Sequence, residues 1–466
     1  MKLLYQDLLK FLNEKPSKEI LSERLFQLGH EHEINGEIFD MELTPNRGDC
    51  ISLKGLARDL NAFFGKDQPF KIYKEDIEPL SLDFKNLSPE ICPKISFLQI
   101  EIDGNVSKYK SYLEDYFSLL GNNKVNFFTD ISNYLSYELG QPTHCFDYDT
   151  INGQLVFENR ICKESFKTLL GSEINLTGKN SVFSVNNEII SLAGVMGGMS
   201  TSCKENTKKV LIECAFFLPE AIIGKSIKYN LISDAAHRFE RGVDIGAQEK
   251  ALRRFIEIVK DHTSIKKIKI QSFDSNCPKK TSIPIDVKRI NKILGINLHE
   301  KDYLKHLQDL GFDTETEIII PSFRHDISTQ NDLAEEIARV IGFDAIDSKP
   351  IKINRKLKNY EDNINSISNL LVKYGFNEVI NFPFTSNKIN NSIEIDNPLD
   401  SNKSFLRTNL RDSLLENLLY NERRQKDSIK LFEISNIFSK NEKISQRTDL
   451  GIIISGRKGH NHVDFS

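Results

Sequence analysis

Residues 210–217 read VLIECAFF, an apolar run that carries a single acidic side chain at its centre. The length of the run and its Val, Ile and Phe content predict a buried β-strand. A carboxylate such as Glu213 is costly to bury unless it is paired or hydrogen-bonded, which makes it a candidate functional group. Strand alternation also allows Glu213 simply to face solvent. The residues alone leave both interpretations open.

The sequence on both sides of this strand has a mixed α/β texture over residues 91–265. A helix is expected from about 245 to 260 because apolar side chains recur there at helical spacing. Asn186-Asn187 is a plausible hairpin turn between the two strands that flank it. The β-type runs around it are 95–102, 155–159, 182–185 and 188–195.

The rest of the chain divides at two polar stretches. Residues 1–90 predict a helix capped by Ser17 and ended by Gly29, then a short strand, a polar turn and a helix ended by Gly65, with a linker over 66–90. Residues 266–282 are rich in Lys, Ser and Pro and indicate a second linker. A compact unit over 283–350 has two strands and three helices, and 351–466 alternates helix and strand. The predicted fold class is α+β and multidomain.

Composition narrows the class of protein. The chain has 466 residues and a formal net charge of −4, which excludes a uniformly basic nucleic-acid binder but not a local basic face. No apolar run approaches the roughly 20 residues that span a bilayer. The seven cysteines are scattered without a CxxC pair, a pattern that favours reduced thiols in a cytoplasm over disulfides or a zinc site. We therefore expect a cytoplasmic protein with no membrane partner.

Three polar or glycine-rich stretches are candidates for a binding site. His144 lies in GQPTHCFD, about ten residues after Ser132 and Asn133, and it is either part of a polar pocket or a structural histidine bonded to the backbone. The small residues of LAGVMGG, 192–198, let a ligand approach the backbone, although glycine turns are common. In SDAAHRFERG, 233–242, Ser233 is typical of a helix N-cap, and the charges fit a solvated helix face.

Four acidic residues follow in RHDISTQNDLAEEIARVIG. Asp332, Glu335 and Glu336 are spaced i, i+3 and i+4, so we expect their carboxylates to share one side of a helix, close to Asp326. Clustered carboxylates without His or Cys suit Mg²⁺. The alternative is an acidic first turn that interacts favourably with the helix dipole.

In this order, the stretches resemble those of one family, the beta subunit of bacterial phenylalanine–tRNA ligase. They span residues 41–440 approximately, and the ordered set is far more specific than any one member. The matching stretches are TPNRGDCISLKGLARDL, DISNYLSYELGQPTHCFD, LAGVMGG, IECAFF, SDAAHRFERGVD, PSFRHDI with DLAEEIARVIGFD, and FLRTNLRDSLLENL with LFEISNIF.

The resemblance implies a subunit of an α2β2 heterotetramer that binds tRNA(Phe), with the ATP-dependent aminoacylation site on the alpha subunit. It implies that 91–265 is a tRNA-editing domain that hydrolyses Tyr-tRNA(Phe), and that 283–350 is a winged-helix-like module. Residues 351–466 would be an incomplete, inactive, class II synthetase-like antiparallel-sheet domain that contacts alpha.

The resemblance also assigns roles to individual residues. His144 and Glu213 become the editing residues: Glu213 would recognise the tyrosine phenol, and His144 would place the ester or its hydrolytic water. The rest of the editing pocket would be Ser132, Asn133, Pro142, Ala193, Gly194, Ser233 and Ala235. The implied ligands of a Mg²⁺ shared with alpha are Asp326, Asp332, Glu335 and Glu336.

The chain departs from the family pattern in three places. There is no room between Gly29 and Thr44 for the usual OB-like insertion, the chain stops within the class II-like region, and position 323 is Phe where the family usually has Trp. We therefore expect a short form in which Lys225, Lys228, Arg238, Arg241 and the lysines of 266–280 give modest phosphate binding. Two rival hypotheses remain, a non-enzymatic assembly and tRNA-docking subunit, and a free-standing hydrolase of misacylated tRNA.

Overall fold

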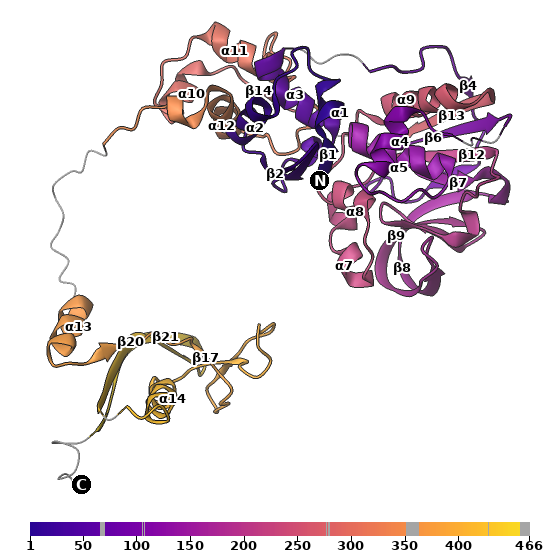
Figure 1. Cartoon of the computed structure of the whole chain (residues 1–466). Helices are drawn as coiled ribbons and strands as arrows, with labels where there is room; N and C mark the ends of the chain where they lie inside the picture. The colour runs from indigo at the N-terminus through magenta and orange to yellow at the C-terminus, as the bar shows by residue number, and fades with distance from the viewer. Residues whose placement is uncertain are drawn as a thin grey trace. The chain divides into compact units, whose positions relative to one another are not determined.

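The computed structural model shows a mixed α+β chain that divides into two compact units, residues 1–349 and 350–466. It describes residues 1–65, 70–104, 106, 108–275, 277, 280–350, 363–426 and 428–456. Each unit has its own sheets and its own buried residues (Figure 1). None of the helices in these described ranges is long and apolar enough to cross a membrane.

The first part of unit 1 is a three-stranded sheet covered by short helices. Ser17 accepts a hydrogen bond from the backbone of Ile20 and so caps α2, as predicted, and Gly65 ends α3. The sheet order is β1-β3-β2. The elements are β1 (Lys2–Leu4), α1 (Tyr5–Leu9), α2 (Lys18–Gln27), β2 (Glu31–Asn35), β3 (Ile38–Glu42), the 3₁₀ turn η1 (Gly48–Cys50) and α3 (Leu53–Phe64).

Two five-stranded sheets form the middle of unit 1. One has the order β11-β10-β9-β8-β5, and the other has the order β4-β13-β6-β12-β7. The strands are β4 (Glu78–Pro79), β5 (Phe84–Asn86), β6 (Lys94–Ile102), β7 (His144–Asp147), β8 (Leu155–Lys167), β9 (Glu173–Val185), β10 (Glu188–Leu192), β11 (Met196–Gly197), β12 (Lys209–Phe216) and β13 (Ile265–Asp274).

Figure 1 shows α4, α5 and α9 beside β6 and β12 of the second sheet, whereas α6 and α7 contact β9 of the first sheet. Asn186 and Asn187 both have positive φ, which confirms the predicted tight turn between β9 and β10. The helices are α4 (Ser111–Ser118), α5 (Phe127–Leu139), α6 (Pro219–Ile222), α7 (Lys225–Tyr229), α8 (Asp234–Phe239) and α9 (Gln248–His262), with 3₁₀ turns η2 (Tyr148–Thr150) and η3 (Met199–Thr201).

The structure corrects both predicted linkers. Residues 265–274 are not a linker but form β13, which pairs with β6 along its whole length. Within 66–90, β4 and β5 each add a strand to one of the two sheets, and residues 66–69 lie outside the described ranges. The two-sheet region therefore begins before residue 91 and ends after residue 265.

The last part of unit 1 contains three helices and a two-stranded sheet, with Gly295 and Gly311 following the first two helices as predicted. Its elements are β14 (Ser282–Ile283), α10 (Val287–Leu294), α11 (Glu300–Asp309), β15 (Ile318–Ile319), α12 (Gln330–Ile341) and the turn η4 (Phe343–Ala345).

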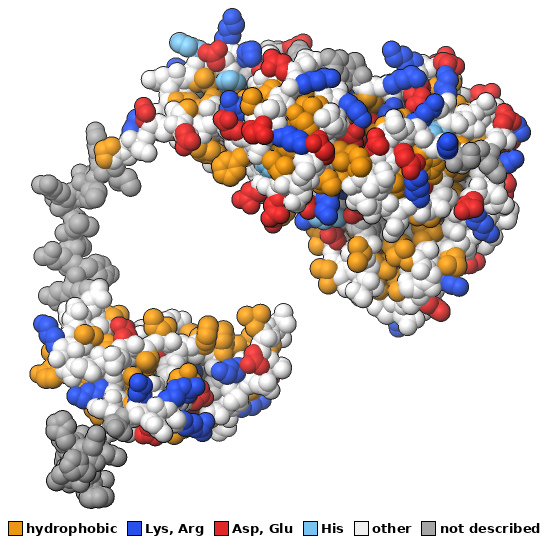
Figure 2. Space-filling model, in the orientation of Figure 1, with side chains coloured by type: hydrophobic (Ala, Val, Ile, Leu, Met, Phe, Trp, Pro, Cys, Tyr) orange, Lys and Arg blue, Asp and Glu red, His pale blue; other side chains and the backbone are white. Residues whose placement is uncertain are grey.

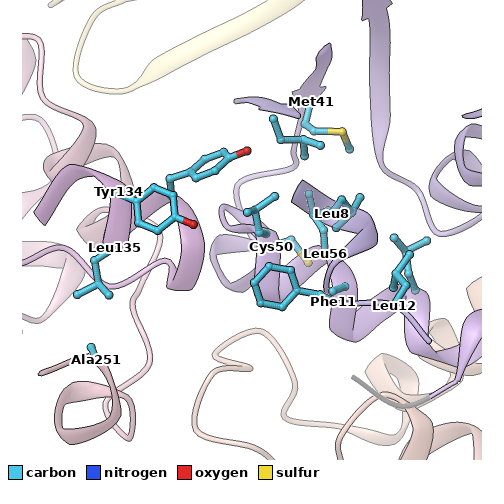
Figure 3. Packing of buried hydrophobic residues seen from close by; sticks show 14 of the residues in the cluster. Leu8, Phe11, Leu12, Met41, Cys50, Leu56, Tyr134, Leu135 and Ala251 are labelled. Atoms are coloured by element: carbon cyan, nitrogen blue, oxygen red, sulfur yellow. The ribbon is translucent and has the colours of Figure 1, made fainter. Parts of the chain in front are cut away.

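Two hydrophobic clusters organise unit 1. The larger cluster joins the N-terminal part, the helices α5 and α9, and the module after residue 282. Figure 3 shows Leu8, Leu56 and Met41 of the N-terminal part near Tyr134 and Leu135 of α5. The second cluster fills the space between the two five-stranded sheets. It is this second cluster that surrounds the candidate site.

Unit 2 is a long antiparallel hairpin with short strands and two helices around it. β20 and β21 pair over thirteen residues each, and Gly451 of β21 lies directly under Leu414 of α14. The elements are α13 (Asn363–Lys373), β16 (Asn377–Glu378), β17 (Phe384–Thr385), β18 (Ile393–Glu394), β19 (Phe405–Leu406), α14 (Arg411–Glu422), β20 (Ser428–Lys440) and β21 (Ile444–Gly456). Of the predicted 351–466 domain, residues 351–362, 427 and 457–466 lie outside the described ranges.

Candidate functional site

Glu213 of β12 and His144 of β7 stand directly opposite each other in the antiparallel register. Residues opposite each other in such a pair project from the same face of the sheet. Strand alternation places them with Leu211, Ala215 and Phe146, all of which belong to the cluster between the two sheets. Both side chains therefore project into the space between the sheets, and the alternative that Glu213 faces solvent is excluded.

Among the described residues, neither of the two groups has a protein partner that would satisfy it. Glu213 is 5% exposed and makes no hydrogen bond or ion pair with the described residues, and burial raises the pKa of its carboxyl to about 8. The Nε2 atom of His144 is buried without a hydrogen-bond partner in the same part of the chain, and burial lowers the pKa of the imidazole to about 4. At neutral pH the site therefore holds a mostly protonated acid and a neutral imidazole.

A protonated carboxyl and a neutral imidazole can take part in a limited set of hydrogen bonds and proton transfers. The protonated carboxyl of Glu213 can donate one hydrogen bond and accept another, and a neutral imidazole can accept a proton. Buried polar atoms without partners are rare in native proteins and call for an explanation such as a catalytic role or a ligand. The pair fits recognition of a hydroxyl combined with hydrolysis.

Gly197 of β11 makes the room that the imidazole occupies. A Cβ atom at this position would lie 2.3 Å from Cε1 and 2.8 Å from Nε2 of His144, and 2.7 Å from Cδ1 of Leu169. No side chain fits there without moving the histidine. The small residues of LAGVMGG predict that a ligand can approach the backbone there. Nothing in the sequence predicts that His144 is the close neighbour of Gly197.

The loop that leads to His144 is held from α5. Ser132 donates a hydrogen bond to the backbone carbonyl of Thr143 at 2.6 Å and lies 2.7 Å from its hydroxyl oxygen. Pro142 is buried, and the amide of Gln141 donates to the carbonyls of Pro142 and Ala215 at 3.0 Å each. Asn133, the next predicted pocket residue, is exposed on the same helix.

The remaining predicted pocket residues lie on the other side of the inter-sheet space. Ala193 is buried in the same cluster, and Gly194 has a left-handed backbone with φ +69° and packs close to Phe217 and Phe239. Ser233 caps α8 and donates a hydrogen bond to the carbonyl of Val195 at 2.6 Å, which ties this helix to the LAGVMGG segment. Ala235 packs against the same cluster. Ser132, Ala193, Ser233 and Ala235 therefore contact the segments that carry the pair or the cluster around it, whereas Asn133 is exposed on α5.

The four acids of the predicted metal cluster do not converge in this way. Glu336 is buried and ion-paired with both Arg324 and Arg339, which lowers the pKa of its carboxyl to about 2. Asp326 makes two hydrogen bonds with Arg324 as well, at 2.8 and 2.9 Å. Asp332, Glu335 and Glu336 all lie on α12 with the spacing that places them on one side of a helix, but Glu336 is buried while Glu335 is exposed.

Asp332 stabilises the start of α12, in line with the alternative interpretation of these acids as part of an acidic first turn. It lies at the third position of α12 and accepts hydrogen bonds from the backbone of Ser328 and Thr329 at 2.8 Å each, and with Thr329 it forms a capping box. With their oxygens committed to arginines and backbone N–H groups, Asp326, Asp332 and Glu336 do not fit a shared Mg²⁺ site with Glu335 in this arrangement.

Within the described residues, one group of three potential ligands does converge, namely His30, Cys50 and Asp59. Asp59 is bound by Arg339 at 2.7 Å and by Arg47 at 3.0 Å, and Arg47 also contacts the sulfur of Cys50 at 2.9 Å. Two guanidinium groups occupy the positions that a cation would need. This cluster is a buried ion-pair network and not a metal centre.

Comparisons with known proteins agree with the order of these parts along the chain. Three family models match: the B3/4 domain over residues 98–264, the tRNA synthetase B5 domain over 283–343, and the phenylalanyl tRNA synthetase beta chain CLM domain over 349–466. The candidate site lies within the first of these matches, and the four acids lie within the second.

Several curated relatives of this chain are phenylalanine–tRNA ligase beta subunits. The phenylalanine–tRNA ligase beta subunit of Burkholderia lata is 30% identical over 426 residues, covering 87% of this chain and 52% of the relative. That of Ralstonia nicotianae is 30% identical over 446 residues, covering 91% and 54%. The chain thus spans about half the length of the curated relatives that it matches. A solved N-terminal fragment of the Pyrococcus horikoshii phenylalanyl-tRNA synthetase beta subunit aligns with a TM-score of 0.42 at 14% identity, covering 73% of this chain and 99% of the fragment.

Proposed function

Because the chain belongs to the phenylalanine–tRNA ligase beta-subunit family, we propose that it works with an alpha subunit that attaches phenylalanine to tRNA(Phe) at the expense of ATP. We propose further that the space between its two five-stranded sheets hydrolyses tyrosine wrongly attached to that tRNA, in the cytoplasm. The α2β2 stoichiometry belongs to the same proposal. The single observation that carries the editing part is the buried, unpartnered pair of Glu213 and His144.

Glu213 supplies the selectivity in this proposal. A tyrosyl side chain brings a phenol that can hydrogen-bond to the carboxyl, whereas a phenylalanyl side chain would leave the buried carboxyl without a partner. Sites built to hydrogen-bond a hydroxyl discriminate against the analogue that lacks it by about 10⁴. The neutral state of the carboxyl suits this task, because the group need not be desolvated as an anion.

His144 serves the hydrolysis of the ester. Its unpartnered Nε2 can accept a proton from water as the water oxygen attacks the ester carbonyl. The bond from that carbonyl to the ribose oxygen breaks, and the ribose oxygen takes up a proton. The products are free tyrosine and a tRNA with an intact terminal hydroxyl. No covalent enzyme intermediate is required.

Single-turnover deacylation of Tyr-tRNA(Phe) tests the proposal. We expect His144→Ala to lower the rate by about 100-fold, in the range that a lost acid–base group gives. Glu213→Gln should weaken the preference for the Tyr ester over the Phe ester. Glu101→Gln on the neighbouring strand β6 is the matched control, since Glu101 is half-buried on the same sheet but opposite Lys209.

The same assay separates the rival hypotheses. Variants that deacylate at the parent rate would leave only an assembly and tRNA-docking subunit. Full activity in the absence of alpha, together with failure to co-purify with it, would favour a free-standing hydrolase.

A further inference from the structure

Within the described residues, Arg238 of α8 is a buried cation that forms no ion pair with a carboxylate. The side chain is 6% exposed, and within the described residues no carboxylate oxygen lies within 4.0 Å of its guanidinium. Its one hydrogen bond runs from Nη1 to the backbone carbonyl of Asp234 at 3.2 Å, and its Nε is buried with no partner in the same part of the chain. The other buried arginines of the described residues are all ion-paired: Arg47, Arg254, Arg324, Arg339 and Arg407.

A charge in this condition is expensive. Burial of an ion costs several kcal/mol unless an opposite charge and hydrogen bonds compensate it. Burial also lowers the pKa of Arg238 from its ordinary value, the reverse of the raised pKa values of the paired Arg254 and Arg324. Such a group points to an anion that is supplied from outside the chain.

The position of Arg238 connects it to the candidate site. Ser233 and Ala235, two of the pocket residues, lie immediately before and within the same short helix. Arg238 interacts electrostatically with the carboxylate of Asp234, which forms no ion pair with it within 4.0 Å, and more weakly with Tyr116. The hydroxyl of Tyr116 donates a hydrogen bond to the carbonyl of Asn133 at 3.5 Å. Arg238 therefore lies on the same short helix as Ser233 and Ala235, within electrostatic range of Tyr116, which is bonded to the backbone of Asn133.

The other basic residues near this region already have protein partners. Lys225 donates to the carbonyl of Lys179 at 2.5 Å, and Lys228 donates to the carbonyl of Thr177. Arg241 contacts Nδ1 of His237 at 3.0 Å and its carbonyl at 3.2 Å. Arg238 differs from all three because it is buried and keeps unused N–H donors.

We propose that Arg238 binds a backbone phosphate in the single-stranded 3′ end of the RNA whose aminoacyl ester enters the His144–Glu213 site. The inference rests on the proposed function for the identity of the anion. A guanidinium suits this ligand because its planar fork of donors matches two phosphate oxygens. Arg238 acts as a positioning residue, since it holds the RNA and does not touch the ester.

Binding of uncharged RNA tests this step without requiring hydrolysis. The probe is a fluorescent RNA hairpin with a single-stranded ACCA 3′ end, titrated with the 466-residue chain at several salt concentrations. We expect Arg238→Gln to weaken binding roughly tenfold and to reduce the log–log salt slope by about 0.7, the value for one lost phosphate contact on a single strand. The exposed Arg289 on α10 provides the control variant, Arg289→Gln, which should change neither quantity.

A second experiment identifies which phosphate is bound. It uses the parent chain, so its result does not depend on whether the Arg238 variant folds. Hairpins with one methylphosphonate at each 3′ linkage in turn should bind the parent chain roughly tenfold more weakly at one linkage. Arg238→Lys, which keeps the charge but loses the fork, should reduce that site-specific effect. Equal losses at all linkages, or an unchanged salt slope in Arg238→Gln, would overturn the proposal in favour of an acidic partner protein.

Deacylation kinetics keep this proposal separate from the proposed function. Arg238→Gln should raise KM for Tyr-tRNA with little change in kcat, whereas loss of His144 should lower kcat. If the chain binds RNA through Arg238 but does not deacylate Tyr-tRNA, only the editing assignment is contradicted. If the chain deacylates Tyr-tRNA normally but Arg238→Gln does not change RNA binding, only the proposed phosphate contact is contradicted.

Discussion

Glu213 and His144 hold unusual protonation states because of where the two strands place them. Both side chains project between two apolar sheet faces, and no charged group among the described residues favours the ionised form of either. Desolvation therefore acts alone, raising the pKa of the acid and lowering that of the imidazole. An acid and a base whose pKa values are moved so far from their ordinary values are typical of functional sites.

The raised pKa of Glu213 predicts a pH-dependent stability. In the native chain this pKa is about 8, against 4.5 for an unperturbed glutamate, so the native state binds one proton more than the unfolded state between these values. The stability that this group contributes is fully present below pH 4.5 and is lost as the pH rises through about 8. We expect the parent chain to lose about 2 kcal/mol of unfolding free energy between pH 6.5 and 8.

Urea unfolding followed by circular dichroism at these two pH values measures the effect. Glu213→Gln, which cannot ionise, should remove most of the loss, while Glu101→Gln should retain it. The lowered pKa of His144 acts in another window, since its contribution is present above pH 6.5 and is lost as the pH falls through about 4. An equal loss in the parent and in Glu213→Gln would contradict the assignment.

The sequence predicts a site residue when the residues that determine its position are close to it in the chain. The strand around Glu213 and the cap at Ser233 follow from neighbours within a few residues, and both were predictable. The contact between Gly197 and His144 joins strands more than 50 positions apart, and nothing in either segment encodes it. The same limit explains Glu336, whose arginine partners are known only once the turn before α12 is folded.

At the level of helices and strands, β13 shows why a polar composition can hide a strand. Its residues run Ile-Lys-Lys-Ile-Lys-Ile, and the register with β6 shifts between Ile265 and Lys267. A bulge of this kind adds one residue and breaks the two-residue alternation that identifies a strand. The lysines then suggest a linker although the isoleucines still reach the core. Helices with clear caps, such as α2 and α3, had no such interruption and were predicted correctly.

The start of α12 provides a test of what its acids do. Because Asp332 accepts hydrogen bonds from the backbone of Ser328 and Thr329 just before α12, Asp332→Ala should lower the unfolding free energy by about 1 kcal/mol, the usual cost of a lost cap. The loss should be the same in Mg²⁺ and in a chelator. Glu335→Ala, at an exposed position of the same helix, should change stability by less than about 0.5 kcal/mol. Urea unfolding in the two buffers measures both variants, and a loss confined to Mg²⁺ would restore the metal interpretation.

At the level of the whole molecule, a buried ion-pair network joins the two ends of unit 1. Asp59 of α3 binds Arg339 of α12 across 280 positions of sequence, and Arg339 continues to Glu336 and Arg324. His30 and Arg47 complete the shell around Asp59. The network fixes the module after residue 282 against the N-terminal part.

Removal of Asp59 should therefore weaken unit 1 as a whole. Asp59→Ala leaves Arg47 and Arg339 buried without their shared carboxylate, and we expect a loss of about 3–5 kcal/mol in unfolding free energy. The surface pair of Glu249 and Arg253 is the comparison, since Glu249→Ala should cost less than about 0.5 kcal/mol. Urea unfolding measures both, and a loss below about 1 kcal/mol for Asp59→Ala would show that the network contributes little.

Unit 2 differs, because it has an apolar surface that the residues described in this unit leave exposed. Figure 2 shows apolar side chains exposed on this unit, and along β21 the exposed apolar positions Leu450, Ile452 and Ile454 alternate with less exposed ones. In the described residues β21 pairs with β20 alone, so it is an edge strand. Exposed apolar edges in native proteins usually mark an interface.

Under the proposed function the alpha subunit covers this face. We expect the double change Ile452→Lys and Ile454→Lys to abolish co-purification with alpha, because two charges would have to be buried there. Gln446→Lys with Thr448→Lys places the same charges on the same face of β21, where the side chains are already polar, and should leave capture intact. Equal capture by both double variants would place the alpha-binding surface elsewhere on the chain, because a partner that buried this face could not tolerate the first pair.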